Sequence, residues 1–521
     1  MLLKSTVVVS AMTLISRFLG LARDIIFANF FGANGGTDAF FVAFKIPNFM
    51  RRLFAEGAFS QAFVPVFSEY KETRSFAELK DLVNHVAGAL GGFLLILSIL
   101  GSLAAPLLVY LFAPGFTDEG RFQLTAEMLA ITFPYIFFIA LTAFAGGILN
   151  SFSKFAVPAF TPVLLNLCLI TAAIWSSEYF DRPIMALAWG VAVAGFLQLL
   201  FQLPFLMQLK LLPRPQFKRA HAGVKKIQKL MLPAIIGSSV AQINLLLDTI
   251  IASFLVAGSV SWLYYSDRLV EFPLGVFGIA LATVILPSLS KQHAQQSNEQ
   301  FTLTLDWALK LTSIIAIPAA LGLLLLASPL LTTLFGYGEF SLSDIHMSSL
   351  SLMAYALGLP AFIYIKVLAP GYYARQDTKT PVRIGIQAMI ANMFLNLLFV
   401  IPLVLIEFEG THVGLALATT CSAYMNAFML YLGLKRQGIY TRQSGWGKLW
   451  LQILLANTLM IAFLFLSSPS METWYNWPLV ERIPYLLGFV FIAMGIYIAS
   501  MLLFGFRPKH LKHNAPVSAS S

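Results

Sequence analysis

Long apolar runs follow one another along almost the whole chain, separated by short polar segments. A transmembrane helix needs about 20 mostly apolar residues, and the sequence contains fourteen runs of that kind. The runs are continuous rather than alternating, which excludes β-barrel strands. We therefore predict an all-α polytopic membrane protein with about 14 transmembrane helices. The predicted spans are 5–31, 38–68, 84–113, 122–149, 157–176, 184–207, 230–256, 260–289, 307–335, 347–371, 382–405, 412–434, 449–468 and 483–505.

The polar segments between these runs alternate in charge. Every second segment is basic, as in residues 71–80, 210–229 and 435–448, and the tail after the last run is basic too. The remaining segments carry mostly aspartate and glutamate. By the positive-inside rule the basic set is cytoplasmic. Both termini are then predicted to be cytoplasmic, which agrees with an even number of spans.

Composition limits the class of protein further. The chain of 521 residues is 58% hydrophobic and 11% charged, whereas soluble domains are about 25% charged. No sizeable soluble domain is expected. The net charge of +10 comes from the basic loops, which we expect to contact membrane lipids rather than nucleic acid. The first run carries Arg17, Arg23 and Asp24 and lacks a small-residue cleavage site, so we interpret it as a retained span rather than a signal peptide.

Catalytic and cofactor motifs are missing from the sequence. Cys168 and Cys421 lie far apart, and the seven histidines are scattered without the spacing of a zinc motif. No Gly-Lys-Ser/Thr phosphate loop is present, so direct use of ATP is not expected. We predict a transporter without a cofactor, driven by a Na⁺ or H⁺ gradient or by the membrane potential.

The two halves of the chain resemble each other at an offset of 222 to 223 residues. Pro65 in one half corresponds to Pro287 in the other, and residues 150–154 correspond to 374–379. Six spans per copy give both copies the same orientation, as in parallel-repeat transporters. The prediction is a six-helix lobe over 1–222, a second over 223–437, and two additional helices with a basic tail over 438–521.

Charged residues gather inside spans one, two and eight. A charge at the bilayer centre costs roughly 2.5–3.5 kcal/mol on insertion scales, so it usually faces a partner or a wet cavity. The set includes several arginines, whose guanidinium groups bind phosphate in bidentate fashion. We predict a cavity for an anionic substrate; the alternative is fixed helix ion pairs such as Arg52–Glu56 or Arg268–Glu271. The residues are Arg17, Arg23, Asp24, Asp38, Lys45, Asn48, Arg51, Arg52, Glu56, Asp267, Arg268 and Glu271.

A second polar group lies in spans seven, eleven and twelve. Asp248 is embedded in an apolar stretch, Asn392 and Asn396 are four residues apart, and Thr419 lies on the next span. Carboxylate, amide and hydroxyl oxygens suit a small hard cation, so these residues are a candidate sodium site. The alternative is hydrogen bonding between helices.

Several motifs resemble the MurJ (MviN) lipid II flippase family of the MOP exporter superfamily. They include Ser16–Gly20 with Arg23-Asp24, residues 37–48, residues 51–65, residues 258–269 and residues 366–377, and the resemblance covers all fourteen spans. It implies two six-helix lobes plus two helices forming a groove for a lipid tail. The implied activity moves lipid II, a peptidoglycan precursor, from the inner to the outer leaflet of the bacterial cytoplasmic membrane by alternating access. Cell-wall synthesis proteins are further implied partners.

The resemblance also assigns roles to residues of this chain. The family's cavity arginines fall on Arg17, Arg23, Arg51 and Arg268, and its acidic partners on Asp38 and Glu271. Ser261, Asp267 and Asn48 match other cavity positions. The sodium site of some members falls on Asp248, Asn392, Asn396 and Thr419, with Asn396 at a position that can hold a carboxylate.

Other classes fit the sequence less well. A cation-coupled drug exporter of the same superfamily would need acidic and aromatic groups for cationic drugs and twelve spans. An exporter of another lipid-linked oligosaccharide is the nearest alternative. A membrane-embedded transferase or hydrolase would need an Asp/His set, which the scattered histidines do not supply, and a scaffold would use its charges only for helix packing.

Overall fold

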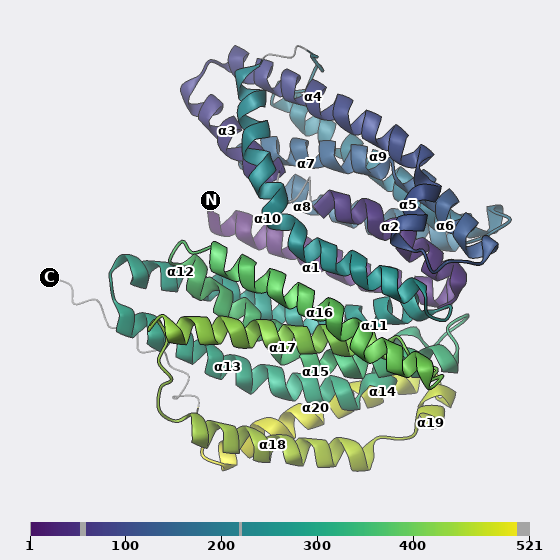
Figure 1. Cartoon of the computed structure of the whole chain (residues 1–521), viewed down its shortest axis with the longest axis vertical. Helices are drawn as coiled ribbons and strands as arrows, with labels where there is room; N and C mark the ends of the chain where they lie inside the picture. The colour runs from purple at the N-terminus through teal and green to yellow at the C-terminus, as the bar shows by residue number, and fades with distance from the viewer. Residues whose placement is uncertain (1, 53–58, 218–220, 508–521) are drawn as a thin grey trace. The chain divides into compact units, whose positions relative to one another are not determined.

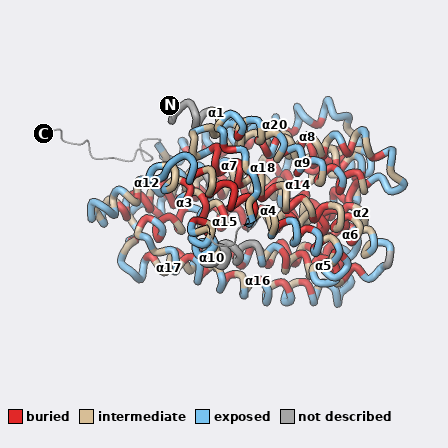
Figure 2. The backbone as a smooth tube through the Cα atoms, turned by 90° about the horizontal axis from the view of Figure 1, so that it is seen from above, coloured by how far each residue is buried: buried red, intermediate tan, exposed pale blue. Residues whose placement is uncertain are grey.

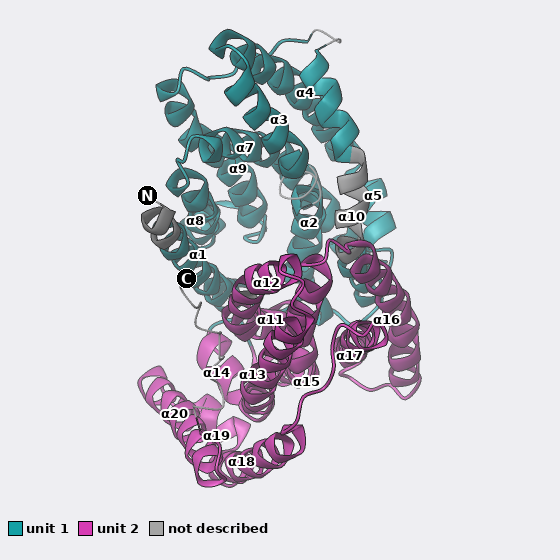
Figure 3. Ribbon diagram, turned by 90° about the vertical axis from the view of Figure 1, so that its left-hand side faces the viewer, with its two compact units in different colours: residues 1–261, 338–340 teal, residues 262–337, 341–521 magenta. Residues whose placement is uncertain are grey.

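The computed structural model describes residues 2–52, 59–217 and 221–507, and within these ranges the chain is helical and contains no strand (Figure 1). The predicted all-α fold is confirmed. Two compact units are present, Met1–Ser261 with Gly338–Phe340, and Trp262–Tyr337 with Ser341–Ser521 (Figure 3).

The helices of the first unit cover the first six predicted spans and the seventh. They are α1 (Leu2–Phe31), α2 (Gly35–Arg51), α3 (Ser60–Thr73), α4 (Phe76–Leu103), α5 (Ala105–Phe112), α6 (Glu119–Thr132), α7 (Tyr135–Ser151), α8 (Ala156–Thr171), the π-turn η2 (Ala172–Ser176), the 3₁₀ turn η3 (Ser177–Tyr179), α9 (Met185–Gln208) and α10 (Ala222–Ser253).

Helix α11 (Ser259–Pro273) begins in the first unit and continues into the second. The rest of the second unit consists of η4 (Leu274–Gly278), α12 (Ile279–Ala294), α13 (Asn298–Leu325), α14 (Ala327–Phe335), α15 (Leu342–Tyr373), α16 (Lys379–Leu405), α17 (Val413–Arg436), α18 (Trp446–Ser467), α19 (Met471–Asn476) and α20 (Leu479–Leu503).

Capping residues fix where several helices begin. Asn34 accepts the backbone N–H groups of the first turn of α2, and Thr37 returns a bond to Asn34. The same reciprocal capping box starts α4 and α15, the latter through Ser341 and Asp344. These side chains satisfy helix N–H groups that have no partner inside the helix.

Eleven helical segments of the described chain are long and apolar enough to cross a membrane. They coincide with predicted spans three to six and eight to fourteen, so a multi-pass membrane protein is established while the count of fourteen stays a prediction. The other three predicted spans also lie on helices, namely α1, α2 with α3, and α10. The first two contain the arginine clusters, and of α10 the stretch Ile243–Ser253 is apolar.

Irregular points of the helices recur at the offset of the predicted repeat. Ala104 ends α4 and starts α5 with φ −87° and ψ 8°, and Leu326, 222 residues later, joins α13 to α14 with φ −96° and ψ 14°. Ser153 after α7 and Gln376 after α15 are 223 residues apart and have φ values of 59° and 61°. Positive φ is uncommon outside glycine, and it recurs at positions that the predicted repeat makes equivalent; the two six-span copies stay a prediction.

Each unit has its own apolar core, and Figure 2 shows buried stretches alternating with exposed ones along the helices. In the first unit Phe63, Phe67 and Phe144 are fully buried with residues of α4. In the second unit the core joins α13 and α15 to α18 and α20. The two compact units are defined by the contacts between residues, with a boundary after Ser261. The predicted division at residues 222 and 437 is based on the repeat and stays a prediction.

Candidate functional site

Arg23 is the most deeply buried of the predicted arginines. Only 6% of it is exposed, although it lies in the middle of α1. Its Nη2 and Nε donate to Asp24 Oδ1 at 2.6 and 2.9 Å, and its Nη1 donates to Asn166 Oδ1 of α8 at 3.1 Å. Asn166 in turn donates to the Ser16 carbonyl at 3.0 Å. This network holds a guanidinium inside an apolar helix pair, while Arg17, six residues earlier, is exposed.

The carboxylate of Asp38 is buried at the start of α2 and binds the start of α11. Its Oδ1 accepts the Ser261 N–H at 2.8 Å and the Ser261 hydroxyl at 2.6 Å, and its Oδ2 accepts the Gly258 N–H at 2.7 Å. Asp38 therefore caps a helix that begins 221 residues later. A helix N-terminus favours a negative charge, which suits a buried carboxylate.

The end of α2 holds the second arginine cluster. Arg51 Nε donates to Asn48 Oδ1 at 2.8 Å, and both residues are half-buried. Arg52 follows on the same helix end and is also half-buried. The alternative pairing of Arg52 with Glu56 involves a residue outside the described ranges. Asn48 and Arg51 are thus in contact at the end of α2, where Arg51 and Arg52 are consecutive residues.

On α11 the charged group of the second unit is partly paired. Arg268 Nη1 donates to Glu271 Oε2 at 2.8 Å, and Nη2 donates to the Tyr264 hydroxyl at 3.1 Å. The guanidinium also lies over the Tyr264 ring, 5.0 Å from its centroid. Asp267 and Glu271 are exposed, and Arg268 is half-buried. A salt bridge at such a site is weak, so it can open in favour of a stronger anion.

The candidate cation ligands fall into two groups. Asn396 Nδ2 donates to Asn392 Oδ1 at 3.1 Å, and Asn392 Nδ2 lies 3.5 Å from Thr419 Oγ1, so three of the predicted ligands meet between α16 and α17. Both asparagines are buried. Asp248 is half-buried on α10 in the first unit.

Three partners of these residues were not singled out in the sequence. Asn166 lies 143 residues from Arg23, and an asparagine in an apolar span is its only sequence signal. Gly258 contributes a backbone N–H, which leaves no side-chain signal. Tyr264 lies four residues before Arg268, so helical spacing could have indicated it.

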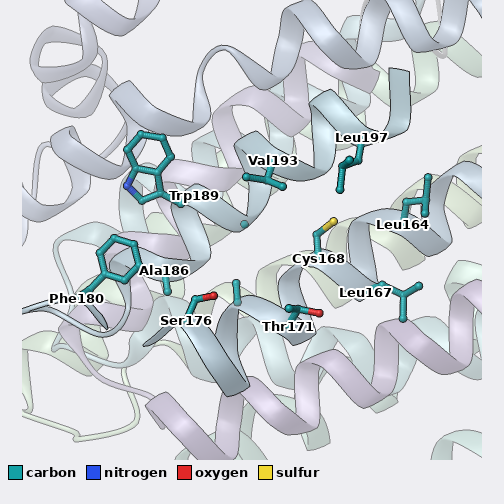
Figure 4. Close-up of a pocket in the computed structure, with 12 residues that line it drawn as sticks. Leu164, Leu167, Cys168, Thr171, Ser176, Phe180, Ala186, Trp189, Val193 and Leu197 are labelled. Atoms are coloured by element: carbon teal, nitrogen blue, oxygen red, sulfur yellow. The ribbon is translucent and has the colours of Figure 1, made fainter. Parts of the chain in front are cut away.

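An apolar pocket of about 460 Å³ lies apart from these charges (Figure 4). It is formed by α8, η2 and α9, and its lining includes Leu167, Cys168, Trp189 and Leu197 but no charged residue. Such a lining suits hydrocarbon and cannot bind a diphosphate.

Eleven apolar helices of the described chain that are long enough to cross a membrane, with guanidinium and carboxylate groups buried in the helical units, place the chain in the class of multi-pass membrane transporters. Residues 27–485 match the family model of the lipid II flippase MurJ. The chain belongs to this family.

Full-length relatives agree with this assignment. The chain is 48% identical to a probable lipid II flippase MurJ of Vibrio cholerae, with 98% of each chain covered. It is 40% identical to the lipid II flippase MurJ of Burkholderia cenocepacia, with 99% of each covered.

Solved structures show the same fold. A lipid II flippase MurJ in an inward closed conformation matches with a TM-score of 0.78 and 29% identity, covering 96% of this chain and 98% of that one. An inward-facing multidrug resistance transporter of the MATE family of the MOP superfamily matches with a TM-score of 0.66 over 89% of this chain and 99% of that one. At 14% identity this second likeness concerns the fold alone.

Proposed function

We propose that this chain moves lipid II from the inner to the outer leaflet of the bacterial cytoplasmic membrane by alternating access, and so supplies peptidoglycan synthesis. The observation that carries the proposal is a set of arginines within apolar helices in a chain of the lipid II flippase family. Lipid II is an anion with a diphosphate, and guanidinium groups bind phosphate oxygens through paired hydrogen bonds.

Arg17, Arg23, Arg51 and Arg268 are proposed to bind this diphosphate. Arg23 and Arg268 are already paired with Asp24 and Glu271. A carboxylate partner keeps each guanidinium neutralised while no substrate is bound, and a diphosphate can replace it. Asp38, Asn48, Arg52, Ser261 and Asp267 are proposed to line or support the same cavity.

The test is a depletion-and-rescue assay that measures how accessible lipid II is from each leaflet. We expect Arg23→Ala and Arg268→Ala to lose at least tenfold in flipping while inserting normally. Arg436→Ala, an exposed arginine at the end of α17, is the matched control and should rescue fully. Normal flipping by the two cavity variants would overturn the arginine proposal. Restored cell growth without lipid II movement would favour a different lipid-linked oligosaccharide.

We propose that both termini face the cytoplasm. The charge alternation of the loops supports this orientation. In a chain lacking Cys168 and Cys421, a cysteine at Ser75 should be protected from an impermeant thiol reagent added outside intact cells, and one at Glu409 should react. The opposite labelling pattern would contradict the orientation.

Energy for transport is proposed to come from a Na⁺ or H⁺ gradient or from the membrane potential, without a cofactor. Asn392, Asn396 and Thr419 supply oxygen ligands from one pair of helices, and Asp248 supplies the carboxylate. Asp248→Asn and Asn396→Ala should each abolish a sodium dependence of flipping. Flipping that ignores both sodium removal and these changes would exclude a sodium site.

Membrane lipids and cell-wall synthesis proteins are proposed as further partners, and nucleic acid is not. Basic loops favour anionic headgroups, and an activity that delivers a peptidoglycan precursor must meet the proteins that make and consume it.

A further inference from the structure

Two histidines and an aspartate outside the proposed substrate site meet in the first unit. Asp81 and His85 lie one turn apart near the start of α4, and His221 directly precedes α10. One potential metal-ligand atom from each of the three side chains lies within 4.8 Å of the other two. The two imidazole rings are stacked, with centroids 4.8 Å apart.

The spacing of the ligand atoms suits one ion. His85 Nδ1 lies 3.3 Å from Asp81 Oδ1, and His221 Nε2 lies 3.6 Å from Asp81 Oδ2. Two ligands on one tetrahedral zinc, each about 2.1 Å from it, stand about 3.4 Å apart. We propose that Asp81, His85 and His221 form a binding site for a divalent transition-metal ion of the zinc class.

The surroundings hold these side chains in place without an ion. The backbone N–H of Arg214 donates to Asn84 Oδ1 at 2.7 Å, and that of Gln216 donates to the Asn84 carbonyl at 3.0 Å. Residues 214 and 216 are thus fixed on α4 next to His85. His85 Nδ1 also lies 2.9 Å from the Asp81 carbonyl, and this hydrogen bond fixes the ring until an ion takes its place on Nδ1.

Burial and charge also favour an ion. The side chains of His85 and His221 are 7% and 14% exposed, while Asp81 is 49% exposed and leaves a path for entry. The cations Arg74 and Lys226 pair with Glu78 and Glu69 rather than with Asp81. Histidine nitrogens with one carboxylate are ligands of zinc sites that keep a position for water.

Metal binding would change two hydrogen bonds of the protein, that between His85 Nδ1 and the Asp81 carbonyl and one at His221. His221 Nδ1 accepts the Gly223 N–H at 3.1 Å and caps α10. An ion on Nε2 moves the remaining ring proton to Nδ1, so the cap bond is given up. That loss is small beside three metal–ligand bonds. The ion would then join the start of α4 to the start of α10 within the first unit.

The test uses full-length protein without a histidine tag, purified in detergent and stripped with a chelator. Zinc is titrated by calorimetry, and Co²⁺ serves as a spectroscopic probe of ligand geometry. We expect one zinc per chain, with affinity lowered at least about tenfold in His85→Ala, His221→Ala and Asp81→Asn. His293→Ala, an exposed histidine in the last turn of α12, is the matched control and should bind as the parent does.

Folding is checked by the melting temperature of each variant without metal. Zinc should raise the melting temperature of the parent and of His293→Ala and leave that of the three site variants unchanged. Absence of zinc uptake by the parent would overturn the proposal, and so would equal uptake or equal stabilisation in His85→Ala. This outcome is independent of lipid II movement, since none of the three residues is assigned to the substrate cavity.

Discussion

At the scale of single residues, Asp38 shows how a costly buried carboxylate is made stable. It accepts three hydrogen bonds, two from backbone N–H groups at the start of α11 and one from the Ser261 hydroxyl. Hydrogen bonds to a charged group are worth about 1.5–3 kcal/mol each. The contact joins the beginnings of α2 and α11, which the predicted repeat makes equivalent.

Two variants that weaken this contact to different extents are expected to separate the contribution of the charge from that of packing. Ser261→Ala removes one hydroxyl donor and should lower stability by about 1–2 kcal/mol. Asp38→Asn places an amide N–H₂ against a backbone N–H and should cost more. The measurement is thermal unfolding in detergent, with Ser288→Ala on α12 as the control. Equal melting temperatures for Asp38→Asn and the parent would show that the contact does not stabilise the fold.

Some site residues could be predicted from spacing, and others could not. Arg268 with Glu271, and Asn392 with Asn396, lie within one helical turn, so their contact follows from the sequence. Arg23 with Asn166 and Asp38 with Ser261 join segments 143 and 223 residues apart. Such pairs depend on how helices pack, which apolar patterning does not determine.

At the scale of elements, the turns that follow α7 and α15 share one backbone conformation. Ser153 and Gln376 both have left-handed backbone conformations there. This conformation costs a residue with a Cβ about 1–2 kcal/mol, and glycine adopts it readily.

Gln376→Gly should therefore raise stability by about 0.5–1 kcal/mol, because the gain at positive φ exceeds the added freedom of the unfolded chain. Ser153→Gly should act in the same direction. Gln376→Val should lower stability, since a β-branched residue tolerates this conformation poorly. The check is the melting temperature of the three variants. A stabilising effect of valine would refute the strained-turn interpretation.

The start of α16 depends on a titratable residue outside the spans. Asp377 Oδ1 accepts the Thr380 N–H at 3.0 Å, and hydrogen bonds to Thr380 hold the pKa of Asp377 below the usual value of an aspartate. A lowered folded-state pKa gives stability that is present above about pH 4 and lost as the pH falls through the folded value.

Asp377→Ala is expected to cost about 1 kcal/mol at pH 7, as for loss of a helix-capping side chain. The difference from the parent should shrink as the pH is lowered below 4, because the parent then loses the same contact. Melting curves at pH 7 and pH 3 test this, with Glu409→Ala in an exposed loop as the control. A deficit that is equal at both pH values would contradict the charge-dependent cap.

At the scale of the whole molecule, hydropathy was enough to predict a polytopic helical protein. It could not predict where spans break. The runs 84–113 and 307–335 are each two helices, joined at Ala104 and Leu326. The π-turns at 172–176 and 274–278 are also invisible in the pattern. Apolar residues satisfy a membrane environment in either backbone geometry, so composition carries no signal for these breaks.

The two helices outside the predicted repeat, α18 and α20, are held to the rest of the second unit by one buried arginine and a shared apolar core. Arg482 at the start of α20 donates to the carbonyls of Thr332 and Gly336 at 3.0 and 3.1 Å, and also to those of Trp477 and Tyr475. Because it satisfies carbonyls at the end of α14, it fixes α20 to the repeated part of the chain.

This packing predicts the result of removing residues 438–521. The apolar core of the second unit includes Trp446, Ile453 and Leu464 of α18 and Tyr497 of α20, together with Leu305 and Leu309 of α13. Their removal strips buried apolar surface from α13, at about 25 cal/mol for each Å². The truncated chain should therefore accumulate poorly in the membrane and melt well below the parent.

Surface changes on the same helices separate this structural role from a role in transport. Phe491 and Ile498 on α20 are 60% and 49% exposed, so their replacement by alanine should leave the melting temperature close to that of the parent. If α18 and α20 also form a groove for the lipid tail, these variants should flip lipid II more slowly while remaining folded. A truncated chain that folds and accumulates like the parent would show that the last two helices are a detachable addition, since the second unit would then keep its core without them.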